Sequence, residues 1–172
     1  MTIFLETERL LLKELDLEDL DFMTALLSDP LTMRYFPKLY SRKEVEQMIE
    51  KHRFRYRLQG HSVWLLQRKD TKEAVGELGL VMQSVENKAE PEIGYILHPK
   101  HWKNGYATEA GLAVRDYAFE KLNYPYVISL VRPVNKPSQA VARRLGMEVS
   151  RKAQFFGYEH LVFRVDKSQL RA

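Results

Sequence analysis

The feature that most constrains this chain is an apolar strand followed by a turn of small residues and then a helix. Ile93–Leu97 has the composition of a buried strand, and an amphipathic helix is predicted over Thr108–Leu122. The first N–H groups of a helix have no intrahelical partner and carry the positive end of the helix dipole. Because Gly105 and Ala107 have almost no side chain, an anionic group can approach these N–H groups closely. The turn therefore indicates a pyrophosphate-binding site, and a tight turn needed only for packing is the alternative.

Two other phosphate-binding patterns are excluded. A Walker A loop needs a second glycine followed by Lys-Ser or Lys-Thr, and this turn has neither. A Rossmann fingerprint needs three glycines at fixed spacing near the start of its domain. The glycine of this turn stands alone and lies past the middle of the chain.

Apolar periodicity and capping residues predict elements in the order β-α-α-β-β-β-α-β-α-β-β. The predicted strands are Arg9–Leu15, Val63–Gln67, Ala74–Met82, a strand ending at Leu97, Tyr126–Val131, Glu148–Phe156 and His160–Val165. The predicted helices begin at Asp16, Ser41, Thr108 and Asn135, and a polar loop is expected over Ser84–Ala89. Three consecutive strands before the long helix exclude a doubly wound fold and indicate an α/β domain on one mixed sheet.

Length and composition limit the number of domains and the kinds of site that the chain can form. At 172 residues the chain is long enough for one domain with its own core, so a single domain over residues 1–172 is expected. The absence of cysteine excludes disulfides, thiolate metal sites and an acyl-cysteine intermediate. The five histidines are scattered without metal-ligand spacing, so no metal is expected. Glu6 and Glu8 interrupt the N-terminus, and no apolar run reaches the roughly 20 residues that span a bilayer, so we expect a soluble, cytoplasmic protein.

A basic run, Lys51–Arg57, alternates with aromatic residues on the second predicted helix. Interleaved basic and aromatic residues occur in nucleic-acid-binding proteins. The alternative is the solvated face of an amphipathic helix. Attraction of an anionic cofactor or substrate would equally explain the net charge of +4.

Four stretches, in order and spacing, resemble the GCN5-related N-acetyltransferase (GNAT) family, and its RimJ/RimL-type branch more closely. They are Thr7–Leu12, Glu92–Leu97, Trp102–Ala110 and Asn135–Met147. The resemblance implies a central, mixed, mostly antiparallel twisted sheet of about seven strands flanked by four helices. It also implies a cofactor cleft between splayed strands and acetyl-CoA (coenzyme A) as co-substrate.

The resemblance further implies which residues bind the cofactor. The backbone N–H groups of Lys103, Asn104, Gly105, Tyr106, Ala107 and Thr108 would hold the pyrophosphate. The main chain of Ile96 and Leu97 would pair with the pantetheine as an added strand does. Asn135 and Ser138 would line its far side. The family's phosphate pattern begins with Arg or Gln, whereas this chain has Trp102, as is common in the RimJ/RimL branch.

For catalysis, the resemblance places Glu92 where many relatives carry a basic carboxylate. A carboxylate desolvated in a cleft has a raised pKa, as a general base requires. The alternative is that Glu92 only orients neighbours or pairs with an arginine, and Glu77, Glu90 and His98 are possible substitutes.

The group that serves the departing thiolate is the second catalytic question. The tyrosine that many members use is replaced here by Ala142. Ser138 matches the serine viewed as serving the thiolate in the RimJ/RimL branch. The alternative is that its hydroxyl caps a helix and contacts the cofactor.

The expected function is acetyl-CoA-dependent N-acetyl transfer to a primary amine, on a protein N-terminus or a small molecule, by direct attack. A non-catalytic acyl-CoA-binding or regulatory domain is the second hypothesis, and a ribosome- or RNA-associated module is the third. A monomer or homodimer is expected. Aromatic residues in Pro30–Tyr40 and Phe155–His160 suggest an acceptor pocket, with core packing or a dimer contact as alternatives.

Overall fold

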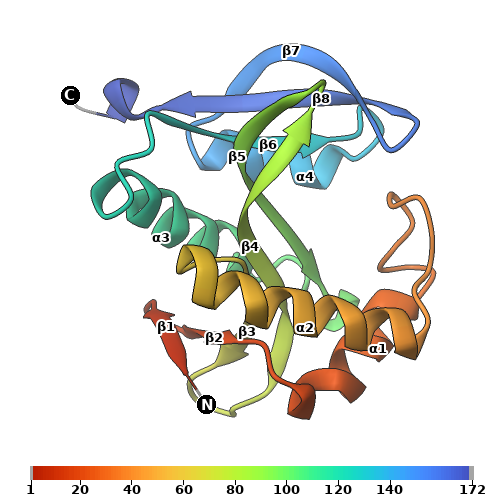
Figure 1. Cartoon of the computed structure of the whole chain (residues 1–172). Coiled ribbons are helices and arrows are strands. Elements are labelled where there is room, and N and C mark those ends of the chain that lie inside the picture. The colour runs from red at the N-terminus through yellow and green to blue at the C-terminus, as the bar shows by residue number, and fades with distance from the viewer. Residues whose placement is uncertain (1, 171–172) are drawn as a thin grey trace. The chain divides into compact units, whose positions relative to one another are not determined.

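Eight strands form one mixed sheet in the order β1-β2-β3-β4-β5-β6-β8-β7 (Figure 1). A computed structural model describes residues 2–170 of the chain. The strands are β1 (Ile3–Glu6), β2 (Leu10–Glu14), β3 (Val63–Arg68), β4 (Ala74–Val85), β5 (Lys88–Leu97), β6 (Tyr126–Val131), β7 (Glu148–Phe155) and β8 (Tyr158–Asp166). The α-helices in the described residues are α1 (Leu20–Ser28), α2 (Arg42–Gln59), α3 (Tyr106–Glu120) and α4 (Lys136–Arg144). The expected α/β architecture is confirmed, and the sheet has one strand more, β1, than the periodicity predicted.

The chain forms two compact units. The first consists of the described part of Met1–Gly79 together with Tyr95–Ala110. The second consists of Leu80–Gly94 and the described part of Gly111–Ala172. Strands β4 and β5 and helix α3 each continue from one unit into the other. No helix within residues 2–170 has the length and apolar character needed to cross a membrane.

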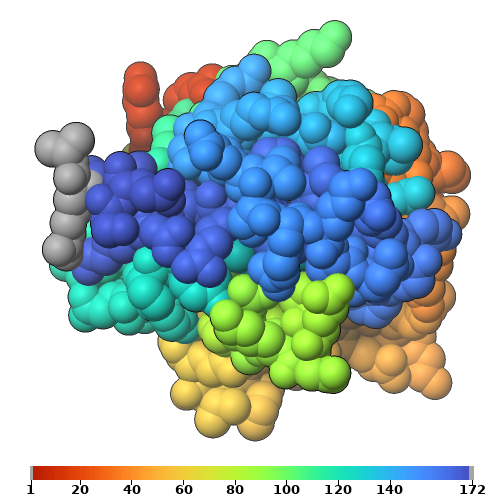
Figure 2. Space-filling model, turned by 90° about the horizontal axis from the view of Figure 1, so that it is seen from above, coloured from red at the N-terminus to blue at the C-terminus, as the bar shows by residue number. Residues whose placement is uncertain are grey.

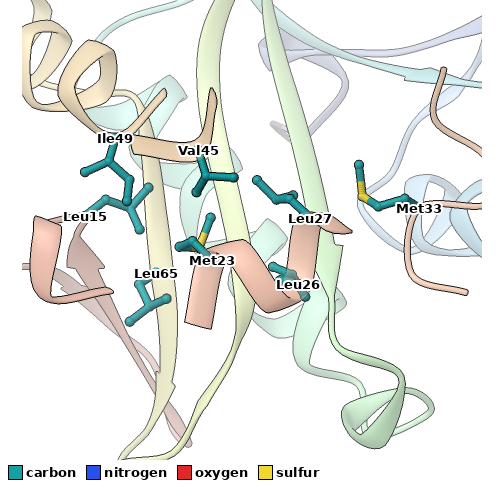
Figure 3. Packing of buried hydrophobic residues seen from close by; sticks show 8 residues of the cluster. All are labelled: Leu15, Met23, Leu26, Leu27, Met33, Val45, Ile49 and Leu65. Atoms are coloured by element: carbon teal, nitrogen blue, oxygen red, sulfur yellow. The ribbon is translucent and has the colours of Figure 1, made fainter. Parts of the chain in front are cut away.

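The core of the first unit lies where α1 and α2 pack on the sheet (Figure 3). Leu15 and Leu65 supply the sheet side of this cluster and Val45 and Ile49 supply α2, all at most 2% exposed. Val45 and Ile49 stand four residues apart and therefore share one face of the helix. The buried residues of the cluster are Leu15, Met23, Leu26, Leu27, Met33, Val45, Ile49 and Leu65. This apolar layer fixes α1 and α2 over β3 and β4.

The ends of α2 confirm the capping prediction. The Ser41 side chain accepts from the Glu44 N–H, and the Glu44 carboxylate accepts from the Ser41 N–H at 2.8 Å. At the other end Gly60 has φ +78°, and its N–H donates to Tyr56 O at 2.9 Å. A reciprocal capping box and a left-handed glycine satisfy backbone groups that have no intrahelical partner.

In the second unit, β6 pairs antiparallel with β8 from Tyr126 to Val131, and β8 pairs antiparallel with β7 at the sheet edge. Figure 2 shows the side chains of β7 and β8 covering the upper face of this unit (blue). A small core of Val85, Ile128, Ala153 and Val162 is buried in this unit.

The structure corrects the predicted loop over Ser84–Ala89. Strand β4 runs to Val85 and β5 starts at Lys88, so the connection is only the pair Glu86–Asn87, with φ +49° and +67°. Two positive φ values match the type I′ geometry that favours tight hairpins. Glutamate is unusual at such a position, and the polar composition of the segment therefore predicted a loop where the backbone forms a hairpin.

Helix α3 begins two residues before its predicted start. Gly105 O accepts from the Glu109 N–H at 2.9 Å, which places the first helical residue at Tyr106 instead of Thr108. The aromatic ring at position 106 is 8% exposed, so packing favours its inclusion in the helix.

Candidate functional site

The Gly105 turn, in the first unit, presents backbone donors at the start of α3. Since the first α-helical bond is Glu109 N to Gly105 O, the N–H groups of Tyr106, Ala107 and Thr108 have no intrahelical acceptor. Residues 103–105 are exposed, and Lys103 and Gly105 have φ values of +64° and +79°. These left-handed conformations reverse the chain before the helix. The geometry fits the expected diphosphate-binding turn.

Two side chains hold this turn in shape. The Trp102 indole Nε1 donates to Leu97 O at 2.8 Å, and the Asn104 Nδ2 donates to His101 O at 3.1 Å. The short 3-10 turn Pro99–His101 lies between these contacts. Trp102 therefore connects the turn to the end of β5. At the position where the family pattern has Arg or Gln, this chain has a tryptophan with a structural role.

The two residues expected to pair with pantetheine present their main chains to opposite sides. The His98 N–H donates to Val75 O of β4 at 2.9 Å, and strand alternation turns the main chain of Ile96 to the same side. The Ile96 carbonyl lies against Gly76, where a Cβ would stand only 2.3 Å from that oxygen. The main-chain groups of Leu97 therefore point away from β4, and its carbonyl is taken by Trp102. The N–H of Leu97 is the group best directed for an added strand.

In the second unit, Glu92 lies where β5 and β6 pair in parallel. The registered pair is Glu92 opposite Ile128. Beyond it, the Ser129 hydroxyl donates to Ile93 O at 2.6 Å, and the Leu130 N–H donates to the Glu92 carboxylate. Side chains thus replace the regular ladder at the point where the two strands part.

The environment of Glu92 raises its pKa. Burial is the dominant cause, and hydrogen bonds from the Gln83 amide, at 2.9 Å, and from the Leu130 N–H oppose it. A carboxyl with a raised pKa at a strand divergence has the property of a general base. The same contacts let it orient the β6 backbone, so both interpretations of Glu92 have structural support.

The three alternative candidates for the general base, Glu90, His98 and Glu77, lie in different environments. Glu90 is buried and bonded to Arg151 Nη2 at 2.6 Å and to the Tyr126 hydroxyl at 3.0 Å. Burial favours its neutral form, but these bonds lower its pKa overall, which makes it a poor base at neutral pH. The His98 Nδ1 accepts from the Lys100 N–H at 3.2 Å, so this ring caps the 3-10 turn.

Glu77, in the first unit, is the alternative base candidate whose pKa is shifted furthest from its ordinary value. Its side chain is buried, and Oε2 has no hydrogen-bond partner within residues 2–170. Burial raises the pKa of Glu77 to about 7.

At the start of α4, Asn135 is the N-cap, and its Oδ1 accepts from the Ser138 N–H at 3.2 Å. The N-cap is therefore Asn135, and Ser138 stands at the third position of the helix. An asparagine at N-cap is preferred because its short side chain reaches the third helical N–H. Ala142, where many relatives have tyrosine, is buried on this helix.

The structure thus groups Ile96, Leu97 and Lys103–Thr108 in the first unit. Glu92, Asn135 and Ser138 belong to the second unit. Among the described residues no group of three or more His, Cys, Asp or Glu side chains is arranged to hold a metal.

Sequence reasoning missed three polar partners, one of the candidate base Glu92 and two of Glu109, which follows the Gly105 turn. Gln83 bonds Glu92, and Thr7 and Arg9 bond Glu109 on the first turn of α3. Arg9 and Glu109 are 100 residues apart in the chain. An acidic residue in the first turn of a helix was the only signal for the latter contact, and it does not identify the partner.

The fold is that of an acetyltransferase of the GNAT type. The family model described as "Acetyltransferase (GNAT) domain" matches residues 9–148, and the chain belongs to this family. Members of the family use acetyl-CoA and amine substrates.

Known proteins resemble the chain over most of its length. The uncharacterized protein YkkB of Bacillus subtilis is 34% identical over 86% of each chain. The uncharacterized N-acetyltransferase p20 of Bacillus licheniformis is 33% identical over 84% of this chain and 82% of its own. The crystal structure of an acetyltransferase from Agrobacterium tumefaciens has a TM-score of 0.83 and 29% identity, covering 97% of this chain and 96% of that one. The expected family and enzyme class are confirmed.

Proposed function

We propose that the protein transfers the acetyl group of acetyl-CoA to a primary amine, on a protein N-terminus or a small molecule, in the manner of the RimJ/RimL-type branch. The observation that carries this proposal is the Gly105 turn, whose exposed residues 103–105 lead into a helix start with free backbone N–H groups that fit a diphosphate. Family membership supports acetyl-CoA as the donor and an amine as the acceptor.

In the proposed reaction the neutral amine attacks the thioester carbonyl directly. A C–N bond forms, the C–S bond breaks, the amine proton passes to a base, and the sulfur leaves as a thiolate. The N–H of Leu97 is the proposed donor to the carbonyl oxygen, since a fixed backbone dipole stabilises developing charge. Glu92 is the proposed base, and its raised pKa supports this role.

The thiolate of coenzyme A leaves more readily than an alkoxide, so it needs little help from an acid. Ser138 is proposed to contact it from the first turn of α4. Because Ala142 cannot donate a proton, no tyrosine acid serves this step at that position.

Within each unit, exposed aromatic residues are the proposed contacts of the acceptor. Phe36 is 40% exposed in the first unit, and Phe156 and Tyr158 are 70% and 41% exposed in the second. Their exposure excludes the core alternative for these three residues. An aromatic wall binds the apolar part of an amine and, through cation–π contact, its charged form.

The test is a thiol-release assay with acetyl-CoA against peptide N-termini, polyamines, amino acids and aminoglycosides, together with calorimetric titration of acetyl-CoA. We expect binding of acetyl-CoA and thiol release with at least one amine class. Gly105→Glu, which places a charged side chain in the turn, should abolish binding. No heat of binding in the wild type, or unchanged binding in Gly105→Glu, would overturn the proposal.

The Glu92→Gln variant distinguishes an N-acetyltransferase from a non-catalytic acyl-CoA-binding domain. An enzyme should lose turnover while it still binds acetyl-CoA. A protein that only binds acyl-CoA has no turnover to lose.

A further inference from the structure

We infer that Arg9 is a ligand of the cofactor diphosphate and that Glu109 positions it. The inference rests on the proposed function, since it takes the Gly105 turn as the diphosphate site. Arg9 precedes β2, Glu109 lies on the first turn of α3, and both belong to the first unit.

Glu109 holds Arg9 through both of its oxygens. Oε1 accepts from the Arg9 backbone N–H at 2.8 Å and from the Thr7 hydroxyl at 2.5 Å, while Oε2 accepts from Arg9 Nε at 2.7 Å. Partial burial opposes the ionisation of Glu109, but the bonds from Thr7 and Arg9 lower its pKa overall. Glu109 is therefore ionised at neutral pH and fixes the direction of the guanidinium.

The remaining edge of the guanidinium faces the turn. A Cβ placed on Gly105 would lie 3.4 Å from Arg9 Nη2, and the guanidinium carbon lies 4.6 Å from the centre of the Tyr106 ring. No hydrogen bond or ion pair of Nη1 or Nη2 occurs within residues 2–170. The Arg9 side chain is 45% exposed, so a ligand at the turn can reach these donors.

Charge at the turn explains why an arginine is needed there. A carboxylate on the first turn of α3 is favoured by the helix dipole but repels a second anion. Arg9 neutralises Glu109 through Nε and still offers two N–H-bearing nitrogens to a phosphate. A planar guanidinium can make both contacts at once, whereas a lysine ammonium is a single point charge.

The experiment compares the binding of CoA and of dephospho-CoA, which lacks the 3′-phosphate, to the wild type, Arg9→Met and Arg9→Lys by calorimetry. We expect Arg9→Met to weaken both ligands by about tenfold or more, and by the same factor. Arg9→Lys keeps the positive charge but lacks the planar guanidinium with its paired donors, so we expect the affinity for both ligands to fall by about threefold. Arg42→Met is the matched control because it removes another exposed arginine–carboxylate pair of the same unit, with Asp21 at 2.6 Å.

The salt dependence of CoA binding distinguishes direct contact of Arg9 with the diphosphate from a purely structural role of Arg9. If Arg9 contacts the diphosphate, the affinity of the wild type falls more steeply with added KCl than that of Arg9→Met. A purely structural role would leave this dependence unchanged and would overturn the inference. A loss that disappears with dephospho-CoA would assign Arg9 to the 3′-phosphate and would also overturn it.

Failure of the inference is distinct from failure of the proposed function. A wild type that binds no CoA removes the proposed function. If the wild type binds CoA and both Arg9→Lys and Arg9→Met bind it with the affinity of the wild type, only the role of Arg9 is removed. If Arg9→Met does not fold, the comparison of Arg9→Lys with the wild type decides.

Discussion

Glu77 of β4 lies directly opposite Leu65 of β3 in their antiparallel pairing. Residues opposite each other in such a pair point to the same face of the sheet, and Leu65 belongs to the apolar cluster beneath α1 and α2. A carboxyl that shares this face is removed from water, which raises its pKa to about 7. Such a group is costly to bury as a charge, so its ionisation opposes folding.

We expect Glu77→Gln to become more stable relative to the wild type as the pH rises. The folded-state pKa of about 7 exceeds the ordinary value of 4.5, so the folded state binds more protons between these values. The stability of the wild type therefore falls through this window, by up to about 3 kcal/mol at pH 8, and Glu77→Gln lacks this loss. Urea unfolding at pH 4 and pH 8 measures the difference. Glu46→Gln, an exposed change on α2, should show no such trend, and a pH-independent difference for Glu77→Gln would refute the prediction.

His52 is expected to give the opposite pH dependence. The ring is buried, Nδ1 lies 2.8 Å from Ser62 Oγ, and burial with the nearby charges of Arg55 and Lys51 lowers its pKa to about 4. The unfolded state binds the extra proton between pH 6.5 and 4, so stability is lost as the pH falls through this window, by up to about 3 kcal/mol. His52→Gln should flatten this part of the stability curve. A His52 ring that titrates near pH 6.5 by NMR in the folded protein would contradict the prediction.

Glu92→Gln should lower turnover by about 10²- to 10⁴-fold, the range of a lost general base. The amide keeps the size of the side chain, so the contacts near Gln83 and Leu130 should hold the fold and acetyl-CoA binding should persist. Steady-state kinetics and calorimetry on the same preparation measure both quantities. The matched control is Glu148→Gln on the edge strand β7, where the side chain is exposed. If Glu77→Gln loses turnover and Glu92→Gln keeps it, the base is Glu77.

Trp102→Phe should weaken acetyl-CoA binding by several-fold and lower stability by about 1 kcal/mol. The change removes the indole donor to Leu97 O but keeps a ring beneath Arg34, whose guanidinium carbon lies 5.2 Å from the Trp102 ring centre. Calorimetry and thermal unfolding are the measurements. Trp64→Phe is the control, because Trp64 Nε1 has no partner within residues 2–170 and its ring stacks on Phe4. Trp64→Phe should lose stability without a change in affinity, and equal effects on affinity would show that Trp102 acts only through stability.

The elements that follow from local rules were predictable, and those that depend on distant contacts were not. The capping box at Ser41 and the left-handed Gly60 are encoded within a few residues, so the limits of α2 followed from the sequence. The Glu86–Asn87 hairpin was missed because pairing of β4 with β5, and not the turn composition, decides it.

The features of the candidate site also divide into those that local sequence predicts and those that depend on distant contacts. The Gly105 turn was predicted from its small residues, since the backbone donors proposed to bind the anion lie in one segment. The partners of Glu92 and Glu109 come from other strands, and spacing along the chain does not reveal them. For the same reason the raised pKa of Glu77 required the position of Leu65 across the sheet.

The close approach of β4 to the end of β5 leads to the last prediction. A Cβ on Gly76 would stand 2.3 Å from Ile96 O and 2.8 Å from the Leu97 Cα, and neither backbone atom can move away without shifting β5. Gly76→Ala should therefore destabilise the protein by about 1–3 kcal/mol and weaken acetyl-CoA binding, because the main chain of Leu97 is displaced. Gly94→Ala is the matched control on β5, since its nearest neighbour would be 3.6 Å away, an ordinary contact. Urea unfolding and calorimetry of both variants test this, and a Gly76→Ala protein as stable as Gly94→Ala would show that the two strands tolerate a wider separation.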